Sequence, residues 1–572
     1  MVAAQEQVQK ALFGVFLIAA LLLFAVLLGS VQILALMGFV AVIWALTLPK
    51  HGTMALVLGS VMINSSLLVP FVSGRPFFWE ASLMLSISGL PLMFAMRRNS
   101  PEFGDRLREY RWVFIGLGAF FLVLVSLIKF RGFGLNVLGQ GQVGGRAYVT
   151  QFLGLLFPIL YLAVPTTPQM LIRVYAAHCL MSMSFLVSDF TLAAGGTGPL
   201  WVLLSFFGLS TDSLAFEVQS LEGGVRRFQS VAFVSRDLIY LMLVISPATR
   251  ALSLSSITRV LVILGLLGGS ALGGHRMSMI IIPSVILLSS LVQRTLSAAK
   301  VVVSTLLLGV ALLVTYQTAR QMPHSAQRML SVLPGIEIDP LASVDAENST
   351  SGRASMRRIA FDIAPNFLWV GRGLGFVPDI NHLYTHNEID QYGMLEQSLD
   401  QGIFYAGIPS LLVNLGLPGL AGVFLFLGAV SLVALRNLRS IFRMGCQSTF
   451  DRLTCHVSSL WLVQLVTFMT TTGEAGFFMQ TFGLLSGLVM ITHWHRNRTL
   501  GMAEPTAKTF FNLVDRSRAR SHRRFPGNRW PDRSIDWPHD RLVPGGSARW
   551  SLQAVLRRPG YFSAAPGRCH SR

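Results

Sequence analysis

Apolar segments of about twenty residues recur along most of the chain, and each is long enough to cross the hydrocarbon of a bilayer as a helix. A segment in lipid must satisfy its backbone hydrogen bonds internally, which favours helices. Only 13% of the residues are charged and the mean hydropathy is +0.57, whereas soluble domains carry roughly a quarter charged residues. The sequence therefore predicts an all-α, polytopic integral membrane protein.

The apolar pattern predicts about fourteen transmembrane helices, within a range of twelve to fourteen. They are expected near residues 11–29, 31–49, 52–72, 79–96, 112–130, 149–165, 170–190, 233–248, 257–273, 277–293, 301–318, 417–435, 456–472 and 476–494.

Basic residues in short loops predict the orientation of these helices, because cytoplasmic loops are rich in lysine and arginine. Arg97 and Arg98 follow the fourth expected span, and Arg436, Arg439 and Arg443 follow the twelfth. If both loops are cytoplasmic, the N-terminus is cytoplasmic too. An even number of spans then returns the C-terminus to the same side.

This threading divides the chain into four parts. Residues 1–318 form a transmembrane bundle, 319–416 a large outer loop, and 417–494 the last three spans. The segment FYAGIPSLLVNLG at the end of the outer loop is expected to be a re-entrant or surface helix, because a full crossing would reverse the charge rule.

The remaining part, residues 495–572, is a basic tail that we expect to be disordered and cytoplasmic. The chain has a formal net charge of +19, and much of this excess lies in the tail. The positive-inside rule explains it better than nucleic-acid binding does, so no nucleic-acid partner is expected.

Arg276 lies in GGSALGGHRMSM, at the outer end of two adjoining expected spans. A guanidinium at this depth is costly unless it faces a wet cavity or an anion. Its planar fork of donors suits phosphate oxygens. The alternative interpretation is an arginine that snorkels to the interface.

The outer loop carries a second group of arginines, Arg353, Arg357 and Arg358. In a helix, Arg353 and Arg357 share one face. Together with Arg276 they are candidates for a cationic pocket that binds a pyrophosphate. The alternative is a solvated basic face.

The run GRGLGF follows these arginines and contains Gly373 and Gly375. Glycines in a turn allow a backbone to approach a ligand closely, so both are candidate substrate-binding positions. The run is no dinucleotide fingerprint, because no βαβ pattern surrounds it.

The stretch HLYTHNEIDQYG supplies a candidate general base, His386. Histidine is suited to accept and return a proton near neutral pH. Asn387 is placed to fix the imidazole tautomer or to bind a sugar hydroxyl, and Glu388 to orient the ring. His382 is the second candidate base, and a merely solvated loop histidine is the alternative.

Several reaction classes lack their motifs in this chain. No P-loop is present, so ATP is not expected to drive the protein from within its own chain, and neither HExxH nor paired CxxC occurs. The four cysteines show no disulfide or metal spacing. We therefore expect no metal and no cofactor. Charged residues are scarce inside the spans, which disfavours a proton-coupled transporter.

The order of these motifs resembles the O-antigen ligase and O-antigen polymerase (Wzy-type) superfamily. A mid-chain Gly-Ser-Arg-type motif corresponds to Gly274-His275-Arg276, and a loop arginine to Arg357 or Arg358. A Gly-x-Gly element, a His-Asn pair and a hydrophobic return to the membrane correspond to 371–375, His386-Asn387 and LGLPGLAG. The resemblance covers residues 260–435. His275 replaces the usual small residue, and Asn-Glu-Ile-Asp replaces the more common Asn-x-x-Leu.

The resemblance implies a GT-C-like helical bundle in the bacterial inner membrane. It implies a metal-independent, inverting glycosyl transfer on the periplasmic face, with an undecaprenyl-pyrophosphate-linked glycan as donor. The acceptor would be a glycan in a polymerase or lipid A-core in a ligase, and the sequence leaves both open. Membrane lipid, chain-length regulators and export proteins are the further partners it implies.

Two other classes of function remain as alternatives. A transporter or flippase for a lipid-linked saccharide would use the same arginines to bind phosphate but would need no base. A non-catalytic envelope-assembly protein of the membrane would use the basic tail.

Overall fold

The computed structural model describes residues 38, 51–69, 76–95, 100–133, 145–193, 206–208, 229–247, 257–273, 277–296, 298–374 and 402–499. This part of the chain is 82% helix and contains no strand. The chain divides into two compact units, Met1–Ala503 and Glu504–Arg572. The described residues belong to the first unit. They include only residue 38 of the first two expected spans and only 495–499 of the basic tail, which are helical and not disordered as expected.

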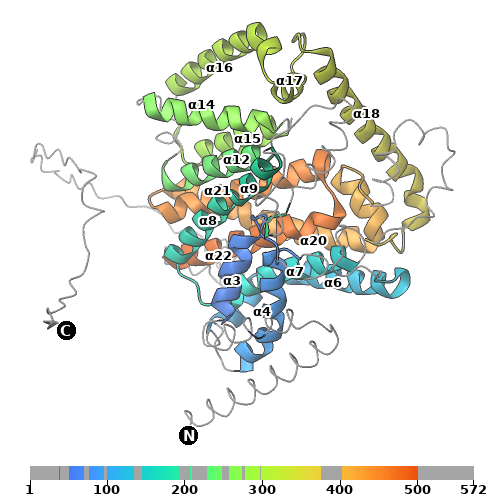
Figure 1. Ribbon diagram of the computed structural model, residues 1–572. Coiled ribbons are helices and arrows are strands. Elements are labelled where there is room, and N and C mark those ends of the chain that lie inside the picture. Colours follow the sequence, from blue (N-terminus) through green and yellow to red (C-terminus); the bar gives the residue numbers. More distant parts are fainter. Residues whose placement is uncertain are drawn as a thin grey trace, which may run out of the picture. The chain divides into compact units, whose positions relative to one another are not determined.

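The helices of the described residues are drawn in Figure 1. The first half comprises α3 (His51–Met62), α4 (Phe78–Ala95), α5 (Phe103–Glu109), α6 (Arg111–Arg131), α7 (Gly145–Ala163), α8 (Pro168–Met181), α9 (Ser184–Ala193), α12 (Gln229–Ile245), α14 (Ile257–Leu272) and α15 (Ser278–Val292). The second half comprises α16 (Ala298–Thr318), η2 (Ala319–Gln321), α17 (His324–Leu330), α18 (Pro340–Ile363), η3 (Ala364–Phe367), α20 (Gly407–Met444), α21 (Thr449–Thr467), η6 (Phe468–Thr472), η7 (Ala475–Phe477) and α22 (Phe478–Thr499).

Five helical stretches among the described residues are long and apolar enough to cross a membrane: Arg111–Arg131, Gly145–Ala163, Pro168–Thr191, Gly407–Met444 and Thr449–Thr471. Shorter apolar helices also occur. The all-helical class of the described part is confirmed, and these helices support a membrane protein. The number of about fourteen spans, the GT-C-like arrangement and the orientation stay predictions.

The core lies where α7, α20, α21 and α22 pack against one another, with α6 on the flank (Figure 1). Aromatic rings fill it. Phe482 lies 5.1 Å from the Trp461 ring and 5.2 Å from the Phe478 ring, measured between centroids. Trp461 Nε1 also donates a hydrogen bond to Ser431 Oγ at 3.0 Å. The buried indole N–H therefore keeps a partner, as apolar surroundings require.

The helix expected over 52–72 is shorter in the structure, because α3 ends at Met62. Ser65 Oγ donates to the Met62 carbonyl at 2.7 Å. Asn64 Nδ2 donates to Asp237 Oδ2 at 2.7 Å and to the His178 carbonyl at 2.9 Å. Such side-chain bonds compete with helical ones. The chain continues in extended form, and Leu68 N donates to the Phe206 carbonyl at 2.8 Å.

Glu102 joins the loop before α5 to the last turns of α22. Its carboxylate accepts a hydrogen bond from Trp494 Nε1 at 3.0 Å and pairs with Arg106 Nη2 at 3.2 Å. It also pairs with Arg498. Partial burial acts to raise the pKa of Glu102, but the Trp494 bond and the guanidiniums of Arg498 and Arg106 outweigh it, so the pKa is lowered.

We expect the Glu102→Gln variant to be less stable than the wild type by about 1 kcal/mol at neutral pH. A carboxyl whose pKa is lowered by folding stabilises the protein above its unfolded pKa, about 4.5. That stabilisation is lost as the pH falls through the folded pKa. Thermal unfolding of both proteins at pH 7 and below pH ~4 measures the effect, and a difference that does not narrow in acid would contradict it.

Candidate functional site

Helix α18 carries the three arginines that the sequence singles out in the outer loop. Asp339 caps its first turn by accepting a hydrogen bond from Leu341 N at 2.8 Å, and Pro340 opens the helix. One face of α18 is buried. It forms a small core with Ala364 of η3, with Phe404 just before α20 and with Val413 in the first part of α20. The members from α18 are Met356, Ile359, Ala360 and Ile363. The helix is thereby fixed to the first part of α20.

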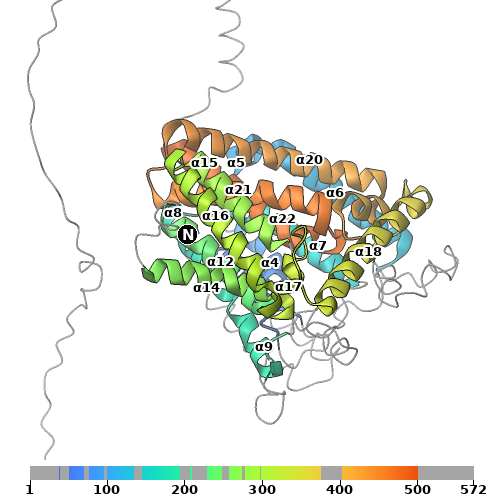
Figure 2. The same ribbon diagram turned by 90° about the horizontal axis from the view of Figure 1, so that it is seen from above.

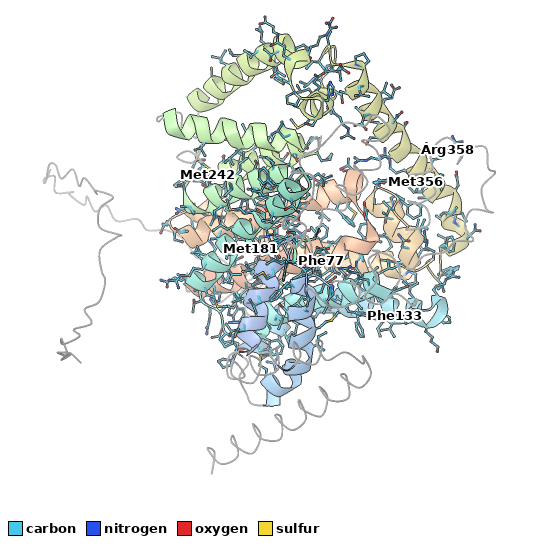
Figure 3. All side chains as sticks on the ribbon, viewed as in Figure 1. Phe77, Phe133, Met181, Met242, Met356 and Arg358 are labelled. Atoms are coloured by element: carbon cyan, nitrogen blue, oxygen red, sulfur yellow. The ribbon has the colours of Figure 1, made fainter. Side chains whose placement is uncertain are left out.

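The three arginines take different positions on α18. Arg353 and Arg357 are half-buried, whereas Arg358 is exposed; Figure 3 labels Arg358 beside the fully buried Met356. Arg357 Nε donates to the Arg353 carbonyl at 3.2 Å. The Arg353 guanidinium lies 5.5 Å from the centre of the Tyr405 ring. The predicted sharing of one helical face by Arg353 and Arg357 therefore holds, and both lie toward the body of the protein.

Helix α20 is broken at Gly416, where φ is 71°. An L side chain is disfavoured there. The break is bridged from outside the helix, since Leu417 N donates to the Leu368 carbonyl at 2.7 Å. A Cβ at Gly416 would lie 2.9 Å from the same carbonyl oxygen. The first part of α20 coincides with the segment expected to be re-entrant or a surface helix, and its relation to a membrane stays a prediction.

The Gly371-Arg372-Gly373 run packs on this break. Arg372 N donates to the Val413 carbonyl at 2.8 Å, and Gly373 N donates to the Asn414 carbonyl at 3.0 Å. A Cβ at Gly371 would lie 2.2 Å from the Asn414 carbonyl oxygen. The close approach expected here is thus made at Gly371 by the chain's own backbone. A ligand role for Gly373 stays a prediction, and Gly375 lies outside the described residues.

Asn414 holds both ends of the segment 375–401. Its carbonyl accepts from Gly373 on one side, and its Nδ2 donates to the Gly402 carbonyl at 2.9 Å on the other. Leu374 N donates to Tyr148 Oη of α7 at 3.1 Å. The two points where the segment leaves and rejoins the described chain are therefore fixed beside the break in α20.

Five of the predicted site residues, Gly375 among them, lie outside the described residues. Like Gly375, the residues His386, Asn387 and Glu388 belong to the segment 375–401, and Arg276 lies between α14 and α15. Their roles stay predictions.

The turn between α21 and α22 packs on the same region. Gln151 Nε2 of α7 donates to the Ala475 carbonyl at 2.8 Å. Ala475 N donates to Ser410 Oγ, in the first part of α20, at 2.9 Å. Half-buried Glu474 precedes Ala475. The N-terminal parts of α7 and α20 and the turn before α22 are thus joined by side chains that sequence reasoning did not assign to the site.

Sequence reasoning also missed a buried ion pair near this region. Arg146 Nη2 of α7 lies 3.1 Å from Glu80 Oε2 of α4, with side-chain exposures of 11% and 4%. Thr150 Oγ1 and Phe77 N donate to the same carboxylate at 3.3 and 2.8 Å. Arg146 is in the same turn of α7 as Tyr148, which contacts Leu374. Glu80 could have indicated this ion pair from the sequence, because a carboxylate at the start of an apolar run needs a partner.

A second polar network lies at the centre of α12. Arg236 Nε and Asp237 Oδ1 are 2.8 Å apart, and 5% of the Asp237 side chain is exposed. Asn64 connects Asp237 to the backbone of α8. His178 Nδ1 donates to the Ser60 carbonyl of α3 at 2.8 Å. Arg236 and Asp237 therefore form an ion pair within α12, and the hydrogen bonds of Asn64 and His178 connect it to α8 and α3.

Comparison with protein-family models gives no match, and comparison with curated proteins gives none either. Within the ranges that the structure describes, no group of three His, Cys, Asp or Glu side chains is arranged to hold a metal ion. Any assignment of function therefore rests on the chemistry of the residues themselves.

Proposed function

We propose that the protein is a bacterial inner-membrane glycosyltransferase. It transfers or polymerises an undecaprenyl-pyrophosphate-linked oligosaccharide on the periplasmic face. One observation carries the proposal: the arginine-bearing helix α18 and the Gly371–Gly373 run both pack on the first part of α20, just before the break at Gly416. A cationic face is thereby fixed beside a non-helical backbone within an apolar helical protein. Such breaks occur at membrane depth where protein or a wet cavity surrounds them.

The proposed reaction breaks the bond between the anomeric carbon and the pyrophosphate oxygen, and the electron pair leaves on that oxygen. Arg353, Arg357 and Arg358, together with Arg276, stabilise the negative charge that gathers on the departing pyrophosphate. An acceptor hydroxyl oxygen bonds to the opposite face of the anomeric carbon, which inverts its configuration. The hydroxyl proton passes to the imidazole of His386.

Asn387 and Glu388 orient the imidazole and the acceptor in this proposal. A glycan acceptor makes the protein a polymerase, and a lipid A-core acceptor makes it a ligase. The polymerase is favoured because the departures from the family motifs at His275 and after Asn387 suit an exopolysaccharide system. Chain-length regulators or export proteins are the corresponding partners.

We expect His386→Ala to lower the rate of glycosyl transfer by about 10²–10⁴-fold while donor binding is kept, because a general base contributes that factor. Arg357→Ala is expected to weaken donor binding by about 10–100-fold, the range for a hydrogen bond to a charged group. Purified protein in nanodiscs, with a lipid-pyrophosphate oligosaccharide and an acceptor, gives both quantities.

The matched control is Arg320→Ala, since Arg320 is an exposed arginine of η2 that pairs with Glu337 at 2.9 Å. Its transfer rate should equal that of the wild type. Unchanged transfer by the His386 variant would exclude this residue as the base. Unchanged donor binding by the Arg357 variant would remove α18 from the site.

The Arg236–Asp237 pair favours a second candidate function, a transporter or flippase for the lipid-linked saccharide. Ionisable side chains inside a membrane often mark substrate or ion pathways, and this pair lies at the centre of α12. If the protein is a transporter, Asp237→Asn will abolish movement of a labelled donor across a proteoliposome bilayer. A folded Asp237→Asn variant that still transfers glycan at the wild-type rate would favour the enzyme.

A further inference from the structure

Helices α6 and α20 lie side by side (Figure 2), and the contacts of two glycines show that they run antiparallel. A Cβ at Gly116 would lie 2.6 Å from Phe426 N, and one at Gly422 would lie 3.1 Å from Phe120 N. Each step forward along α6 thus corresponds to a step back along α20. In this register the first turn of α6, which begins at Arg111, lies beside the last third of α20.

Each helix has an exposed stripe that is apolar along most of its length and basic where the start of α6 lies beside the last third of α20. On α20, Leu432 is 59% exposed. The exposed Arg436, Arg439 and Arg443 continue its stripe, at spacings that share one helical face. The stripe on α6 has the opposite order. Exposed Arg111 and Trp112 begin it, and the exposed apolar residues Ile115 and Leu122 follow.

The arginines at this end fall into two groups. Arg106 pairs with Glu102, Arg498 pairs with Glu102, and Arg496 pairs with Asp451. By contrast, no carboxylate of the described residues forms an ion pair with the second group, which comprises Arg111, Arg436, Arg439 and Arg443.

The two carboxylates of α5 are fewer than the four arginines of this second group. Arg111 stacks 5.5 Å from the centre of the Trp112 ring. Asp105 and Glu109 are the exposed carboxylates of α5, and Glu109 lies 3.7 Å from His493 Nε2. A row of guanidiniums at the end of an apolar, lipid-compatible face therefore keeps an excess of positive charge.

We infer that the surface formed by Arg111, Trp112, Leu432, Arg436 and Arg439 binds an anionic phospholipid. The guanidiniums receive its phosphate, for which their geometry is suited. The apolar parts of the two stripes lie along its acyl chains. The Trp112 ring lies at the level between the phosphate and the acyl chains, where tryptophan is enriched in membrane proteins. This site lies on residues that the proposed glycosyl transfer does not use.

Trp112 provides the reporter for a test. Full-length protein is placed in nanodiscs that contain phospholipids with brominated acyl chains, which quench nearby tryptophan fluorescence. Subtraction of the Trp112→Phe signal isolates the quenching of Trp112. We expect half-quenching to need a lower mole fraction of brominated phosphatidylglycerol than of brominated phosphatidylcholine. The difference should be about fivefold for each arginine that binds the lipid, and it should become smaller as salt is added. Equal quenching by the two lipids in the wild type would overturn the inference without any further variant.

The double variant Arg436→Gln/Arg439→Gln should lose this preference and keep the quenching by phosphatidylcholine. The matched control is Arg173→Gln/Arg320→Gln, which removes the same charge from exposed arginines of α8 and η2 and should keep the preference. A preference lost equally in both variants would assign the effect to net charge and overturn the site. Release of quenching by millimolar inorganic phosphate would identify a simple anion site in place of a phospholipid site.

Discussion

Replacement of Gly371 by alanine is expected to open the junction between α20 and the segment that precedes 375–401. The new Cβ would lie 2.2 Å from the Asn414 carbonyl oxygen and 2.6 Å from Leu415 N. Both atoms are backbone, so no side-chain rotation relieves the contact. The hydrogen bonds from Arg372 N and Gly373 N to α20 would be lost as well. Overpacking and the lost bonds together are expected to cost about 3–5 kcal/mol.

Thermal unfolding in nanodiscs, together with proteolysis in the segment 375–401, measures this effect. The matched control is Gly428→Ala in the exposed face of α20, where a Cβ would meet nothing within 4 Å. Because alanine favours a helix over glycine, this control should be stabilised by up to about 1 kcal/mol. A Gly371→Ala protein with wild-type stability and proteolysis would show that the junction is not as close as the structure has it.

The second large effect is expected for Glu80→Gln. The amide keeps the shape of the side chain and can still accept from Phe77 N. It removes the negative charge 3.1 Å from the Arg146 guanidinium, in a pair whose members are 4% and 11% exposed. Breaking a buried ion pair from one side costs about 3–5 kcal/mol, because the remaining charge stays in apolar surroundings. The contact between α4 and α7 should weaken first.

A double-mutant cycle with Arg146→Gln distinguishes this mechanism from a general loss of packing. The double variant Glu80→Gln/Arg146→Gln should be more stable than Glu80→Gln alone, since it contains no excess charge. Glu347→Gln, at an exposed position of α18, is the control and should change stability by less than about 0.5 kcal/mol. A double variant no more stable than Glu80→Gln would refute a charge effect.

Much of the helical framework could be predicted from apolar run length alone. The ranges expected for 112–130 and 149–165 agree closely with α6 and α7, because long apolar segments have few alternatives to a helix. The early end of α3 was harder to predict. It depends on the hydrogen bond from Asn64 to Asp237, a residue far along the chain. Hydropathy carries no information about such a partner.

The candidate site was only partly predictable. The i, i+4 spacing placed Arg353 and Arg357 on one helix, and the structure has them there. The role of Gly371 depends on Asn414, whose contact arises from tertiary packing, and the pairing of Glu80 with Arg146 likewise joins residues distant in sequence. The proposed base, His386, lies outside the described residues, so its part in the site rests on sequence alone.

The double attachment at Asn414 has an evolutionary consequence. Because the framework already fixes where segment 375–401 departs and returns, the entropy of bringing its ends together depends only weakly on its length, with each doubling costing about 0.6 kcal/mol. Insertions and deletions between Leu374 and Gly402 should therefore be tolerated by the scaffold. A lineage can then lengthen or shorten this stretch around His386, Asn387 and Glu388 without rebuilding the helices that hold it.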